Sequence, residues 1–117
     1  MKKMEDADYV LNDNQYVNDS LRGIVVKILG ELEKEPNNNF LAVLAKELTY
    51  QRARLAMQNR EVAKILPSVN REANVENAER ATAVVIQDFQ KVDEVISHIK
   101  THPLESHEML EEQLESN

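Results

Sequence analysis

The sequence contains no cysteine and no tryptophan, only two glycines and three prolines, and 4% aromatic residues among its 117 positions. Without cysteine, disulfides and thiol chemistry are excluded. The strand pattern of alternating Val, Ile and Tyr between glycine turns is also missing. Residues that favour helix, chiefly Ala, Leu, Glu, Gln, Lys and Arg, are plentiful. The composition therefore predicts one small all-α domain.

The N-terminus and the charge also limit the class of protein. Met1, Lys2 and Lys3 are followed at once by acidic residues instead of an apolar segment, so the start does not resemble a signal peptide. No apolar run approaches the length that spans a membrane. The net charge of −7 argues against direct binding to nucleic acid or to an anionic lipid surface. Together with the lack of cysteine, these features predict a cytoplasmic protein without a membrane segment.

The most regular pattern lies between Val75 and Ile99, where apolar side chains recur with alternating gaps of three and four residues. A repeat of this kind is typical of a long helix that packs against other helices. A helix from Val69 or Asn70 to Lys100 would be about 46 Å long at 1.5 Å per residue. The stripe consists of Val75, Ala78, Thr82, Val85, Phe89, Val92, Ile96 and Ile99.

The N-terminal part predicts a flexible acidic lead over residues 1–13 and then a first helix. Asp13 or Asn14 can cap this helix, and Pro36 ends it, because the residue before proline disfavours α geometry. Gly23 and Gly30 lie seven positions apart, which indicates either close approach of another helix or tolerated surface glycines. The apolar face of this helix is predicted to be Val17, Leu21, Ile24, Val25, Ile28 and Leu32.

A second helix is expected between an asparagine cap in 37–39 and the break at Leu66-Pro67-Ser68. Gln51 and Gln58 stand at two positions of its stripe where apolar residues are expected. Amides in a helical seam cost stability but can fix the register or the oligomeric state. The apolar positions of the stripe are Leu41, Leu44, Leu48, Leu55, Val62 and Ile65.

These segments predict an antiparallel bundle of three main helices over 14–103, followed by a short acidic amphipathic helix or tail over 104–117. The seams of the second and third helices exceed what the short first helix covers. We therefore expect a homo-oligomer, in its simplest form a dimer in which these two helices pair between chains. The expected interface residues are Leu48, Gln51, Leu55, Gln58, Val62, Val85, Phe89, Val92, Ile96 and Ile99.

One basic region could hold an anion. Guanidinium groups bind phosphates or carboxylates in a bidentate manner, and a tyrosine can stack on a base. On one helix these side chains point in different directions, so they would converge only at a junction between subunits. The alternative is a solvated, salt-bridged face. The candidate ligand residues are Tyr50, Arg52, Arg54, Arg60 and Lys64.

His98 and His102 have the four-residue spacing of metal ligands on a helix, although surface histidines at a helix end fit the pattern as well. No nucleophile with a matching base, no phosphate loop and no zinc signature is found. The sequence therefore predicts no enzyme activity and no cofactor. The leading hypothesis is a regulator, adaptor or inhibitor that binds another protein through helix contacts. The alternatives are an oligomeric module for a phosphorylated small molecule or nucleotide, and a structural assembly subunit.

Overall fold

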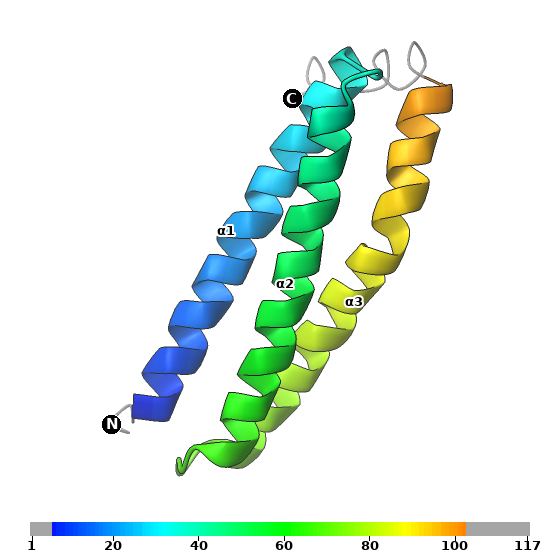
Figure 1. Cartoon of the computed structure of the whole chain (residues 1–117). Coiled ribbons are helices and arrows are strands. Elements are labelled where there is room, and N and C mark those ends of the chain that lie inside the picture. The colour runs from blue at the N-terminus through cyan, green and yellow to red at the C-terminus, as the bar shows by residue number, and fades with distance from the viewer. Residues whose placement is uncertain (1–5, 103–117) are drawn as a thin grey trace, which may run out of the picture.

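The computed structural model describes residues 6–102, which form three long α-helices. Helix α1 spans Asp6–Lys34, α2 spans Asn39–Ile65 and α3 spans Arg71–Thr101. The chain runs along α1, returns along α2 and reverses again into α3 (Figure 1). The predicted all-α antiparallel bundle is thereby confirmed, and residues 6–102 contain no strand. The helix expected within 104–117 lies outside the described residues.

The two connections lie where the sequence predicts them. Asn38 caps α2, and its side-chain oxygen accepts a hydrogen bond of 3.2 Å from the backbone N–H of Leu41. Helix α2 ends at Ile65, immediately before an extended residue that precedes Pro67. Asn70 is the first flanking residue of α3. Pro67 thus ends α2 through backbone geometry and Asn38 caps its start, whereas the side chain of Asn70 makes no capping hydrogen bond to α3.

Helix α1 begins at Asp6, so it extends through most of the region that the sequence predicts as a flexible lead. Two physical effects explain the earlier start. Asp6 and Asp8 lie in the first turn, where negative charge is favourable beside unpaired backbone N–H groups. Asp8 also accepts hydrogen bonds from Ser68, Asn70 and Asn74, at 3.0, 3.0 and 2.7 Å. The acidic start of the chain is therefore joined to the α2–α3 connection.

The inner face of α3 is the predicted stripe. Val75 is half-buried and Phe89 is 41% exposed, whereas the other six positions are buried. The buried side chains pack on α1 and α2 of the same chain. Four residues expected at an interface between subunits are therefore covered within one chain: Val85, Val92, Ile96 and Ile99.

The buried face of α2 differs from the prediction by one position. Its leucines are half-buried, and the fully buried seam beside them consists mainly of small side chains. Helix α2 lies between α1 and α3 and contacts both, and small side chains allow two neighbours to approach one helix closely. The leucines then flank the seam. The seam residues are Ala42, Ala45, Thr49, Arg52, Ala56, Asn59 and Ala63.

The predicted face of α1 is also rotated. Val17 and Ile24 are 48% and 46% exposed, and Asn18 takes an inner position instead. Leu11, Asn18, Val25 and Leu32 share this inner face at seven-residue intervals. None of the three helices has an apolar stretch that could cross a bilayer, judged over residues 6–102.

Candidate functional site

A groove runs between α1 and α3, with α2 as its floor. The two outer helices contact each other far less than either contacts α2. Because residues 6–102 form three helices, this side is where a fourth helix would complete a four-helix arrangement. Toward the C-terminal halves of α1 and α3 the groove encloses about 240 Å³. Its apolar side chains are Val25, Val26, Leu29, Val92 and Val95.

The apolar part of the groove is positively charged, although the chain as a whole has a net charge of −7. Arg22 of α1, Arg52 of α2 and Lys91 of α3 line it, together with a single carboxylate, that of Asp88. Since Arg52 and Asp88 form a pair, Arg22 and Lys91 supply the net charge. This part of the surface therefore favours an acidic occupant.

Arg52 is held in the core by partners from both outer helices. It is 4% exposed, and its Nη1 donates to Asp88 Oδ2 at 3.1 Å. Its Nε donates to Asn18 Oδ1 at 3.1 Å, and Asn18 Nδ2 donates to the Arg52 carbonyl oxygen at 2.9 Å. A buried charge is tolerated only when it is paired and hydrogen-bonded. The floor of the groove is thus a fixed polar network that ties α2 to α1 and α3.

The other part of the groove is lined by amides and has a volume of about 250 Å³. Asn59 forms its floor, where Asn14 Nδ2 donates to Asn59 Oδ1 at 2.9 Å and Asn59 Nδ2 donates to the Leu11 carbonyl oxygen at 3.2 Å. The groove therefore changes from apolar and cationic at one end to neutral and polar at the other. The remaining amides of this part are Asn12, Gln15, Asn74 and Asn77.

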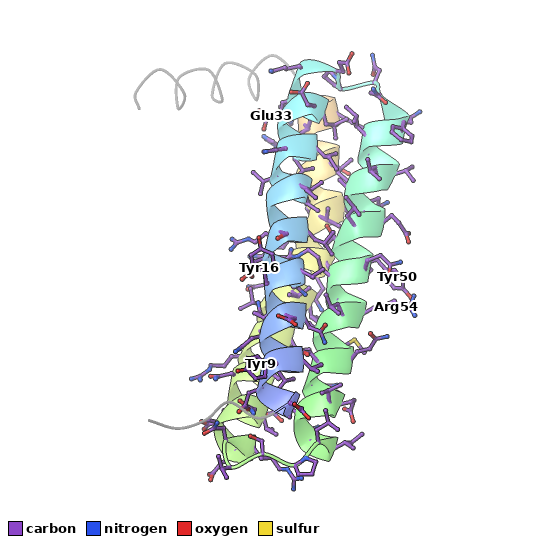
Figure 2. All side chains as sticks on the ribbon, turned by 90° about the vertical axis from the view of Figure 1, so that its left-hand side faces the viewer. Tyr9, Tyr16, Glu33, Tyr50 and Arg54 are labelled. Atoms are coloured by element: carbon purple, nitrogen blue, oxygen red, sulfur yellow. The ribbon has the colours of Figure 1, made fainter. Side chains whose placement is uncertain are left out.

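The candidate ligand residues do not form one site within the described chain. Arg52 is in the core, whereas Tyr50 and Arg54 point outward from α2, on the side turned away from α1 (Figure 2). The Arg54 guanidinium lies 5.9 Å from the centre of the Tyr50 ring, which is a cation–π contact. Arg60 and Lys64 lie 3.7 and 3.8 Å from the same carboxylate oxygen of Glu61.

The histidines and the expected interface residues are also scattered. His98 and His102 stack with their ring centres 4.8 Å apart at the exposed end of α3. No cluster of three or more His, Cys, Asp or Glu side chains within 6–102 has a geometry that could hold a metal ion. On α2, Gln58 is exposed, and the other expected interface residues are half-buried: Leu48, Gln51, Leu55 and Val62.

The predicted apolar faces include two residues of the groove, Val25 and Val92, but the sequence did not indicate the groove itself. Val26, Lys91 and Val95 stand outside the predicted stripes, and they become neighbours only once α1 and α3 are placed beside each other. A usable signal was present for two buried asparagines. Asn18 fits the seven-residue repeat of Leu11, Val25 and Leu32, and Asn59 fits the seam of α2 once alanine is accepted as a seam residue. Comparison with known proteins finds no matching family model, no matching curated protein and no matching solved structure.

Proposed function

We propose that this protein is a non-enzymatic regulator, adaptor or inhibitor that binds an amphipathic helix of another protein in the apolar part of the groove between α1 and α3. The observation that carries the proposal is the groove itself, which residues 6–102 leave open at the position where a four-helix bundle has its fourth helix. Val26 and Val95 are 62% and 41% exposed at its walls, so a helix that covered them would remove apolar surface from water. Helix-in-groove binding is a common mode of recognition.

The charges in the groove indicate the chemistry of the partner. Arg22 and Lys91 flank the apolar side chains, one on each wall. A partner helix that carries Asp or Glu beside its apolar stripe can pair with both. Such pairs raise the association rate and the specificity more than the affinity. The polar groups of the floor, Arg52 and Asn59, are hydrogen-bonded within the chain, which supports a binding role for the groove.

Site-specific photocrosslinking in the native cells tests this function. A photoreactive amino acid replaces Val26 in one variant and Val43 in a matched control. Both valines lie on helices and are nearly equally exposed, at 62% and 63%, but only Val26 lines the groove. We expect crosslinks from position 26 to a segment with an apolar stripe and net negative charge. A synthetic peptide of that segment should then bind the full chain, and Val26→Glu should weaken it at least tenfold while Val43→Glu should not.

Equal crosslinking from positions 26 and 43, or a captured segment that is basic or lacks an apolar stripe, would contradict the proposal. Self-association stays a separate prediction from the sequence, and its test is the molar mass in solution by light scattering. A dimer whose crosslinks from position 26 join two copies of this chain would replace the foreign helix with a second copy. A monomer would mean that no second copy occupies the groove.

A further inference from the structure

We infer that the chain carries its own occupant for the groove, namely the segment 104–117. The apolar part of the groove lies at the end of the bundle where α3 stops at Thr101. The rest of the chain therefore starts beside this part and not beside the amide-lined part. The segment itself lies outside the described residues, and its length and sequence fit the described groove.

The length of a helix formed by the segment matches the length of the apolar part of the groove. A helix over 106–115, capped by Ser106, would be about 15 Å long at 1.5 Å per residue. Val95 and Lys91 stand about 9 and 15 Å before the end of α3 on the same scale. Residues 102–105 provide a connection of the length usual between antiparallel helices. A returning helix would thus cover the groove as far as Lys91 and stop before the amides.

The chemistry of the segment is complementary to the groove. It contains Leu104, Met109, Leu110 and Leu114 as apolar side chains, and Leu110 and Leu114 share one helical face at a spacing of four. It also contains five glutamates and no lysine or arginine. The groove offers valines and Leu29 between Arg22 and Lys91. An isolated helix this short is marginal in water, so docking would supply the stability that it lacks.

The docked segment would be a built-in competitor. Its acidic amphipathic chemistry is the chemistry proposed above for the partner helix, so a partner would have to displace it. That regulatory role rests on the proposed function, whereas docking itself does not. Because the competitor is on the same chain, its effective concentration is in the millimolar range for a short connection, and weak contacts are sufficient to occupy the groove.

Paramagnetic relaxation measured by NMR on the full chain tests the docking. The chain has no cysteine, so Gln113→Cys gives one unique position for a nitroxide label. We expect the label to broaden the amide resonances of Val26 and Val95 severalfold more than those of Val43 and Met57 on the other side of α2. Val26→Glu should abolish the selective broadening, because a carboxylate would face the glutamates, and Val43→Glu should preserve it.

Equal broadening at the four reporter positions would overturn the inference. A mixture of spin-labelled chains without isotope and isotope-enriched chains without label identifies the source of the segment. Selective broadening in that mixture would mean that the segment comes from a second copy, which also overturns docking within one chain. The experiment uses no partner, so its failure differs from failure of the proposed function. If the segment does not dock but a foreign helix still crosslinks at position 26, only this inference is lost.

Discussion

Arg52 on α2 and Asp88 on α3 form a 3.1 Å ion pair in which the arginine side chain is 5% exposed and the aspartate side chain 36% exposed. Lys46 and Asp93 join the same two helices at a shorter distance, 2.6 Å, but both of these side chains are more than half exposed. The exposure of the side chains, and not the distance between them, decides how much each pair contributes to stability. A solvated pair contributes little, whereas loss of one member of a buried pair leaves a charge without compensation.

Asp88→Ala should therefore lower the free energy of unfolding by about 2–3 kcal/mol, because the Arg52 guanidinium loses its charged acceptor. Asp93→Ala is the matched control on the same helix and should cost less than about 1 kcal/mol, because it removes only an exposed pair. Urea denaturation of the two variants measures both values. Equal losses of stability in the two variants would mean that water in the groove solvates the Arg52 charge once Asp88 is removed.

The small side chains of the α2 seam should not tolerate enlargement. Ala45 is fully buried where α2 packs against α1 and α3. Ala45→Leu should destabilise the chain by about 1–3 kcal/mol through overpacking. Ala83→Leu makes the same change at an exposed position of α3 and should be nearly neutral. Thermal unfolding compares the two variants. A neutral Ala45→Leu would indicate that α1 and α3 can move apart around α2.

The carboxylate of Asp8 should hold the start of α1 to the α2–α3 connection. Asp8→Ala removes the acceptor of three side-chain hydrogen bonds and should cost about 2 kcal/mol. Asp6→Ala is the control. It loses only the favourable charge at the start of the helix, worth about 0.5 kcal/mol. The rate of amide hydrogen exchange at Asn70 and Asn74 should rise in the Asp8 variant. Equal exchange rates in both variants would contradict the proposed role of Asp8 in holding α1 to the α2–α3 connection.

Gly23→Ala and Gly30→Ala should each stabilise the protein by about 0.5–1 kcal/mol, because glycine in a helix loses more backbone entropy than alanine. Apart from its own stretch of helix backbone, a Cβ added at either position meets no atom of the described residues within 4 Å. Close approach of α2 or α3 is therefore not the reason for these glycines. Denaturation midpoints measure the effect. A loss of stability would indicate that another molecule covers this side of α1.

The sequence predicted the ends of α2 and α3 and the inner face of α3, because these depend on local chemistry. Prolines, the asparagine cap of α2 and a repeat of Val and Ile act through backbone geometry and burial. The seam of α2 was misplaced for a physical reason. Leu44 and Leu48 have stronger hydrophobicity than Ala45, yet a helix between two neighbours is most buried where its side chains are smallest.

The candidate site could not be predicted in the same way. Arg52 looks like a surface residue in the sequence, and its burial depends on Asp88 and Asn18, which are distant along the chain. Val26 and Val95 look like ordinary exposed valines until α1 and α3 are side by side. A groove is a property of helix placement, and single-helix periodicity contains no information about it.

The hydrogen-bonded residues Asn18, Arg52 and Asp88 separate two parts of the core that differ in the size of their side chains. On the side of the α1–α2 connection lie Ile and Leu side chains, and on the other side the clusters consist mostly of alanine. Bulky aliphatic groups resist local opening more than alanines do. The bundle should therefore unfold locally first at its alanine-rich end. The apolar part of the groove lies at the end that is rich in Ile and Leu. It should therefore keep its shape while the opposite end unfolds locally.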